Sequence, residues 1–235
     1  MQGIPLARWF AASILMTLPQ ALMAQTVFFD DFDGNALLPH WNQPPPHHWE
    51  YNVSNSMLNV TGLFYPSSPK SGGNSTLMNA LFAPQGDFRM DAWMGWDAVQ
   101  RPQRLAIWVA GPYSASPIIA EFGYSNESWR GPLPVIFTGS GASDGSTVAA
   151  PDPGIHHFTI VRAATQFEFY LDSAPVATFP DRFGTPAAAV WFEFGGPYPG
   201  PQSAFHVDRI EVVPAPGTLV PVLTIVLGAV RRKRR

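Results

Sequence analysis

The sequence predicts an all-β fold, a sandwich of two antiparallel sheets. Short runs rich in aromatic and β-branched residues recur along the chain, and clusters of Gly, Pro, Asn, Asp and Ser separate them. No long apolar pattern with the period of a helix is present. About twelve such runs in roughly 190 residues suit two sheets packed face to face.

Each expected strand is bounded by turn residues, and several alternate in polarity. In residues 166–171, Phe167, Phe169 and Leu171 fall on one face and polar neighbours on the other. The expected strands are 26–32, 49–53, 57–60, 76–82, 88–96, 105–110, 118–124, 134–137, 154–163, 166–171, 187–194 and 204–213.

Residues 1–24 have the pattern of a signal peptide. Arg8 supplies the positive charge, an apolar run extends from Trp9 to Leu18, and Ala24 is the small residue at the expected cleavage site. The alternative is an N-terminal helix of the folded domain, but the segment is not amphipathic and has no capping residue. We therefore expect export, with one folded domain over residues 25–213.

The C-terminal segment 214–235 combines a chain breaker, a short apolar run and a basic cluster. Pro214, Ala215 and Pro216 precede the apolar run 219–230, and residues 231–235 are all Arg or Lys. About 12 apolar residues are fewer than the roughly 20 that span a bilayer as a helix. The alternative is a hydrophobic C-terminal strand followed by a solvated charge run.

This tail resembles the PEP-CTERM sorting signal of Gram-negative bacteria that produce exopolysaccharide. In that family a Pro-Glu-Pro motif precedes a short membrane segment and an arginine cluster, and an exosortase processes the protein at the motif. Here Ala215 replaces the glutamate. The resemblance implies an exosortase-type partner, a membrane contact through the tail, and a location in the cell envelope, at the cell surface or in the extracellular matrix.

Charge and cysteine content exclude several classes of function. The formal net charge is −3, but six of the fourteen basic residues lie in the two terminal segments, which contain no acid. The domain between them keeps eight basic and seventeen acidic residues, a net charge of −9. Such a domain repels phosphate backbones, so we expect no nucleic-acid partner. Without cysteine, neither disulfides, a thiol nucleophile nor a Cys-based zinc site is possible.

Three phrases of the domain resemble the concanavalin A-like lectin and glucanase superfamily, which includes laminin G-like domains. The domain opens with residues 29–34, Phe-Asp-Asp-Phe-Asp-Gly, followed by Trp41. Residues 156–162 lead into the strand that ends at Asp172, where the family has a Tyr-Leu-Asp-Gly hairpin and this chain has Ser173 for the glycine. Residues 205–212 are similar to the family's final strand. The resemblance implies a jelly-roll β-sandwich.

The family's laminarinases and lichenases carry a strand with the pattern Glu-x-Asp-x-x-Glu or Glu-x-Asp-x-Glu, which supplies nucleophile and acid. Neither pattern is present, and templates based on a Gly-x-Ser-x-Gly elbow, a phosphate loop or His-Glu-x-x-His are absent too. We therefore expect a protein that is not an enzyme and has no catalytic residue. The alternative is a carbohydrate-active enzyme, a hydrolase or lyase, in which Glu121 and Glu193 come together from separate strands.

A structural calcium ion is a second implication of the resemblance. In many members such an ion ties the opening turn to the last strand, and the matching side chains here are Asp31 and Asp208. The alternative is that Asp31 caps a turn and Asp208 pairs with an arginine. The pairs at residues 47–48 and 156–157 are better explained as surface histidines than as metal ligands, because adjacent strand residues point to opposite faces.

Aromatic side chains give the remaining functional signal, because sugar rings stack on exposed aromatic faces. If the aliphatic residues of their strands face the core, three tryptophans line one outer face together with three acids. This candidate glycan site consists of Trp93, Trp108, Trp191, Asp91, Glu121 and Glu193. The alternative is that the tryptophans fill the core.

These observations favour an exported, non-catalytic surface or matrix protein that binds polysaccharide. A secreted carbohydrate-active enzyme and a purely structural surface protein are the alternatives.

Overall fold

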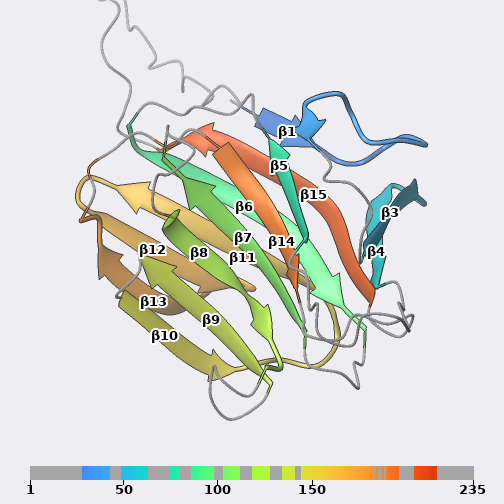
Figure 1. Cartoon of the computed structure of the whole chain (residues 1–235). Coiled ribbons are helices and arrows are strands. Elements are labelled where there is room, and N and C mark those ends of the chain that lie inside the picture. The colour runs from blue at the N-terminus through green and yellow to red at the C-terminus, as the bar shows by residue number, and fades with distance from the viewer. Residues whose placement is uncertain are drawn as a thin grey trace, which may run out of the picture.

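The computed structural model describes residues 28–42, 49–62, 75–79, 86–97, 103–111, 118–127, 134–140, 144–182, 184, 187, 189–195 and 204–215. These residues form fifteen β-strands in two antiparallel sheets (Figure 1). Within these ranges, none of the chain forms a helix long and apolar enough to cross a membrane. The signal-peptide segment and the tail beyond Ala215 lie outside the described residues.

The first sheet has eight strands. In spatial order they are β13 (Ala174–Pro180), β12 (Gln166–Leu171), β11 (Gly154–Ala163), β6 (Phe88–Trp96), β15 (Ala204–Pro214), β4 (Met57–Gly62) and β3 (Trp49–Ser54), and β1 (Phe28–Asp30) pairs with the C-terminal half of β15. The first and last described strands are thus hydrogen-bonded neighbours.

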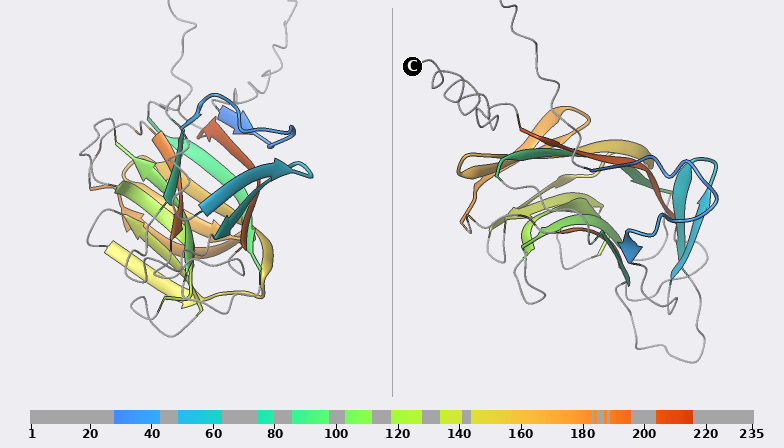
Figure 2. Two further views of the ribbon diagram at one scale, coloured as in Figure 1. Left: turned by 45° about the vertical axis from the view of Figure 1, so that its right-hand side comes forward. Right: turned by 90° about the horizontal axis from the view of Figure 1, so that it is seen from above.

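The second sheet has seven strands and packs against the first. In spatial order they are β10 (Asp144–Ala149), β9 (Val135–Ser140), β8 (Ile118–Ser125), β7 (Arg104–Ala110), β14 (Ala189–Gly195), β5 (Ser75–Asn79) and β2 (Trp41–Asn42). Figure 2 shows both sheets arched in the same direction, with the outer face of the seven-stranded sheet on the inner side of the arch. This hollow outer face is called the concave face below, and the outer face of the eight-stranded sheet is called the convex face.

The core is built by the alternation that the sequence shows. Met90, Ala92 and Met94 of β6 are almost completely buried, as are the alternate residues of β7 and β14 and the two phenylalanines of β12. Large aromatic side chains fill the space between the sheets: Trp49, Trp96, Phe88, Phe122, Phe158, Phe167, Phe169, Phe192, Phe194 and Phe205. The predicted two-sheet sandwich is confirmed.

The structure contains three strands that the sequence did not predict, namely β2, β10 and β13.

Two hairpin turns have an unusual backbone conformation. The β12–β13 hairpin turns at Asp172 and Ser173 with φ of 49° and 69°, so both residues adopt the left-handed conformation of a type I′ turn without a glycine. The β3–β4 hairpin does the same at Asn55 and Ser56.

The start of the proline motif belongs to the sandwich. Pro214 is the last residue of β15 and pairs with Phe88, and the Ala215 amide donates to the Asp87 carbonyl at 3.1 Å. Ala215 is buried. Pro216, the third residue of the motif, lies outside the described residues.

Candidate functional site

A row of large side chains crosses the concave face. The strand register places Trp191 of β14 beside Trp108 of β7, and Trp108 beside Glu121 of β8. The two indole rings lie 6.0 Å apart between centroids, and all three residues are partly exposed. The indole nitrogens of both tryptophans are buried and have no hydrogen-bond partner in the described part of the chain. Three neighbouring strands thus present an aromatic platform that ends at a carboxylate.

A β-bulge in β8 places the Glu121 side chain on the concave face. The pairing of β7 with β8 shifts so that Val109 faces Ala120 whereas Ala110 faces Ile118, which leaves Ile119 as the extra residue. Ile119 and Ala120 are both fully buried in the core, and Ile118 and Glu121 therefore share the outer face. In Glu-x-Asp-x-x-Glu, two residues separate the aspartate from the last glutamate, so a regular strand would point these two side chains to opposite faces. A bulge of this kind brings them to the same face.

If Glu121 is aligned with the last glutamate of that pattern, the sequence retains one of the three acids. The aspartate position falls on Ile118, and the first glutamate position falls on Ser116, which lies outside the described residues. A second carboxylate for chemistry at this site must come from another strand.

Gly139 makes room for the Glu121 side chain. It pairs with Glu121 in the register of β8 and β9. A Cβ atom on Gly139 would lie 3.0 Å from both the Cγ and the Oε1 of Glu121. Glu121 therefore packs over the bare backbone of the neighbouring strand.

A buried ion-pair cluster lies next to this row. Arg104 binds Glu193 Oε1 at 2.5 Å and Glu127 Oε2 at 3.2 Å, and Glu193 is fully buried. Burial alone would lower the pKa of Arg104, but the hydrogen bond and charge of Glu193, together with Glu127, outweigh it and raise the pKa. Arg104 stays charged between the two carboxylates. Sequence reasoning missed Arg104 and Glu127, because their partners are distant in sequence.

The six residues of the expected glycan site do not share one face. Trp108, Trp191, Glu121 and Glu193 lie on the concave face, whereas Trp93 and Asp91 lie on the convex face, on β6. The single-face grouping is corrected: alternation tells which side of its own strand a residue occupies, but not to which sheet that strand belongs.

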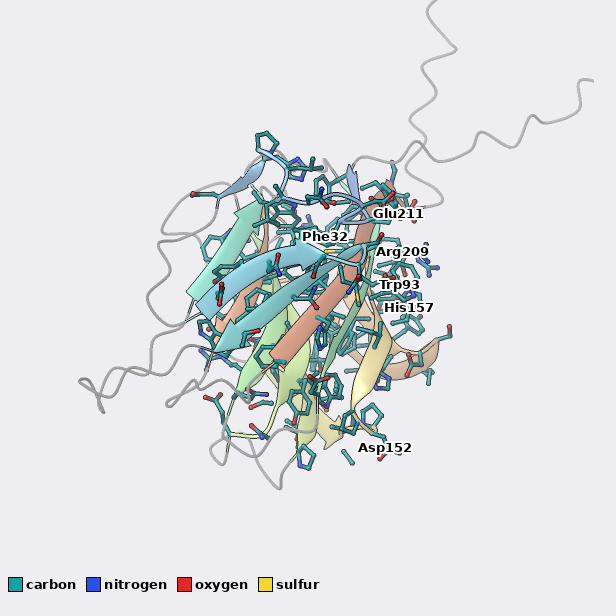
Figure 3. The ribbon with its side chains drawn as sticks, turned by 90° about the vertical axis from the view of Figure 1, so that its right-hand side faces the viewer. Phe32, Trp93, Asp152, His157, Arg209 and Glu211 are labelled. Carbon is teal, nitrogen blue, oxygen red and sulfur yellow. The ribbon has the colours of Figure 1, made fainter. Side chains whose placement is uncertain are left out.

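Trp93 is covered on both ring faces. The His157 ring stacks on it at 4.1 Å with an interplanar angle of 6°, and the Arg209 guanidinium lies 3.7 Å from its ring centroid. These groups come from β11 and β15, which flank β6 on opposite sides. Figure 3 shows Trp93, His157 and Arg209 together on this side of the molecule. The ring faces that a sugar would need are occupied.

Asp31 and Asp208 lie near each other in the fold, at the opening turn and at a bulge of β15. Asp31 directly follows β1, in which Asp30 pairs with Ile210, and the shift in β15 pairing falls at Asp208. Asp31 Oδ1 accepts a hydrogen bond from the Asp33 amide at 3.1 Å, as a turn cap does. No cluster of three or more His, Cys, Asp or Glu side chains suited to a metal occurs among the described residues. Further ligands would have to be backbone carbonyls, and calcium remains a prediction.

The neighbouring Asp30, not Asp31, ties the opening segment to the core. Its carboxylate accepts from the Trp41 indole nitrogen at 2.6 Å and from the Phe32 amide at 2.8 Å. Asp30 is buried. Of the two adjacent aspartates, Asp30 is thus buried and Asp31 is exposed.

No protein-family model and no curated protein sequence matches the chain. Solved structures do match. A laminarinase from Rhodothermus marinus has a TM-score of 0.63 at 13% identity, over 82% of this chain and 98% of that one. A pseudo β-1,3-glucanase of Mycobacterium tuberculosis, described as an immunostimulatory antigen, has a TM-score of 0.60 at 16% identity, over 81% and 99%.

An endo-β-galactosidase from Clostridium perfringens that releases GlcNAcα1-4Gal has a TM-score of 0.57 at 13% identity. The match covers 80% of this chain but only 62% of the galactosidase. These similarities establish the fold as the concanavalin A-like jelly roll of the glucanases, as the sequence predicts. The expectation of a non-enzyme is contradicted, because the laminarinase and the galactosidase are glycan-cleaving enzymes. The missing acidic pattern does not by itself exclude an enzyme, since carboxylates from separate strands can lie on one face.

Proposed function

We propose that the protein is a glycoside hydrolase that binds a polysaccharide along the concave face and cleaves it beside Glu121. The observation that carries this proposal is the row of Trp191, Trp108 and Glu121 across three adjacent strands. The glucanase-type fold supports it. The substrate class is a β-linked glucan or a related neutral polysaccharide.

The tryptophans supply the binding energy. Sugar rings present C–H groups that pack on the partly exposed indole faces. Because the two rings lie 6.0 Å apart, they contact adjacent sugar units rather than one. A polysaccharide bound on both rings therefore extends toward Glu121.

Glu121 acts as the general acid, and Glu193 has a structural role beside it. Glu121 is partly exposed and protonates the leaving glycosidic oxygen, whereas Glu193 is fully buried and binds Arg104. Glu193 therefore orders the site through Arg104 and does not contact the substrate.

A reducing-sugar assay on laminarin, lichenan and galactan tests the proposal with the full chain. We expect the wild type to release reducing ends and E121Q to lower kcat by at least about 100-fold. Glu50 is exposed on β3 of the other sheet, so E50Q is the matched control and should keep full activity. Equal turnover by E121Q and wild type would refute the assignment.

Replacing the tryptophans tests the platform separately. W108A and W191A should each raise KM for the polymer by about 5- to 10-fold, with a smaller effect on trisaccharides that span fewer contacts. An unchanged KM for both variants on every polymer would remove the platform from the proposal.

We further propose that the protein is exported, sorted through Pro214, Ala215 and Pro216, and stabilised by calcium at Asp31 and Asp208. The signal-peptide pattern and the basic tail support export and sorting. The closeness of the opening turn to the bulge of β15 supports the ion site. A melting temperature unchanged by chelator and by added calcium would rule out the ion.

A further inference from the structure

The convex face contains a pocket that the proposed active site does not use. Its volume is about 260 Å³, and its lining residues are Arg89, Thr159, Val161, Tyr170 and Ser173. The strand register explains the grouping, because Thr159 of β11 pairs with Tyr170 of β12 and Val161 pairs with Arg89 of β6. Three adjacent strands form the floor, and Ser173 of the hairpin turn closes one side.

The pocket has no free charge to offer an anion. Arg89 donates to both carboxylate oxygens of Asp91, at 2.6 and 2.9 Å. Asp91 also accepts from Thr159 Oγ1 at 2.7 Å and lies 2.7 Å from His157 Nε2. The charge of the guanidinium is thus neutralised within the wall, and Glu211 adds a further negative charge near it. A neutral, hydroxyl-rich ligand fits these donors and acceptors better than a phosphate or a carboxylate.

Tyr170 is the aromatic surface of the pocket. Its hydroxyl donates to Glu168 Oε2 at 2.5 Å, which fixes the orientation of the ring. Unlike Trp93, which is covered by His157 and Arg209, Tyr170 lines open space. Val161 adds an apolar patch. One ring face, one aliphatic side chain and several hydroxyls are what a single sugar ring needs.

We propose that this pocket is a second glycan-binding site, which holds one neutral hexose unit on the side of the sandwich away from Glu121. The volume is just below the 300 Å³ at which ligand pockets commonly begin, so one ring fits and a longer segment does not. The inference rests on the proposed function for its ligand class. It gives the enzyme a means to stay attached to a polysaccharide while the concave face cleaves it.

Tyrosine NMR of the full chain reads this pocket directly. The chain has six tyrosines, so ring-labelled tyrosine gives a simple spectrum in which Y170F identifies the Tyr170 signal by its disappearance. Methyl β-D-glucoside and methyl β-D-galactoside are the probes, each titrated to 100 mM. We expect at least one of them to shift the Tyr170 signal saturably, while the signal of the core residue Tyr124 stays fixed.

Two variants make the test specific. S173G removes a pocket hydroxyl and relieves a positive φ, so it should fold normally and weaken binding by about 3- to 10-fold. F29A is the matched control, because Phe29 is an exposed aromatic residue on the same face, four strands from Tyr170 in the same row. F29A should bind as the wild type does.

The inference and the proposed function can fail separately. No shift of Tyr170 with either probe, or equal binding by S173G and wild type, overturns the second site even if laminarin is cleaved. A saturable shift that persists in E121Q supports the site even if no substrate is cleaved. Tighter binding of glucuronate than of both glycosides, weakened by salt, overturns the neutral-sugar assignment.

Discussion

At the residue scale, Asp91 organises the polar cluster of the convex face. Arg89, Thr159 and His157 all contact its carboxylate, and the side chain is buried. Burial alone would raise the pKa of Asp91, but the hydrogen bonds of Arg89, Thr159 and His157 and the charge of Arg89 outweigh it and lower the pKa. Folding therefore favours the ionised form of Asp91.

This shift predicts acid sensitivity. A lowered folded-state pKa stabilises the fold fully above the unfolded value of about 3.9, and that stabilisation is lost as pH falls through the folded value. D91N should reduce the free energy of unfolding at pH 7 by about 1–3 kcal/mol, because it removes a buried charged partner. The difference from wild type should shrink below pH 4. Urea unfolding at pH 7, 5 and 3 checks this, and a constant difference would contradict it.

At the element scale, the β11–β12 hairpin contains an avoidable strain. Ala164 in its turn has φ of 55°, a left-handed conformation that costs a residue with a Cβ atom about 1–2 kcal/mol, and it is exposed. A164G should therefore raise the free energy of unfolding by about 0.5–1 kcal/mol, after allowing for the greater entropy of glycine in the unfolded chain. A163G, one residue earlier in the strand, should lower it. Denaturant midpoints measure both, and stabilisation by A163G would contradict the explanation.

The strands also show how far the sequence alone could lead. Alternation located β6, β7 and β12, because one face of each is buried in the core. It missed β10, which is mostly exposed, and β13, an edge strand that contains Pro175 and Pro180. It identified Glu121 and the two tryptophans of the concave face. It could not separate Trp93 from them, because the assignment of strands to sheets depends on pairing between distant segments.

The ion-pair cluster of the site was equally beyond sequence reasoning. Arg104 and Glu193 are 89 positions apart, and only the pairing of β7 with β14 brings them together. The same holds for the bulge at Ile119, which becomes visible only when β8 is paired with β7. The alternation of polar and apolar residues identifies candidate residues, and the order of strands in the sheets determines which of these residues lie side by side.

At the scale of the whole molecule, the two sheets are joined by aromatic contacts in a chain without cysteine. Phe122 of β8 makes edge-to-face contacts with Phe158 and Phe169 of the opposite sheet, at centroid distances of 4.8 and 5.5 Å. All three side chains are fully buried or nearly so. With no disulfide to hold one sheet when the other opens, we expect the sheets to unfold together.

Replacing Phe122 tests this dependence. F122A should lower the free energy of unfolding by about 3–5 kcal/mol, the cost of losing a buried ring and leaving a cavity between the sheets. F29A, at 46% exposure on the convex face, should change it by less than about 0.5 kcal/mol. Far-ultraviolet circular dichroism and tryptophan fluorescence should give the same denaturant midpoint for each protein. Fluorescence reports on both sheets, because Trp108 and Trp191 belong to one and Trp49 and Trp96 to the other. Separate transitions, or a small loss in F122A, would mean that each sheet is stable without the aromatic layer that joins them.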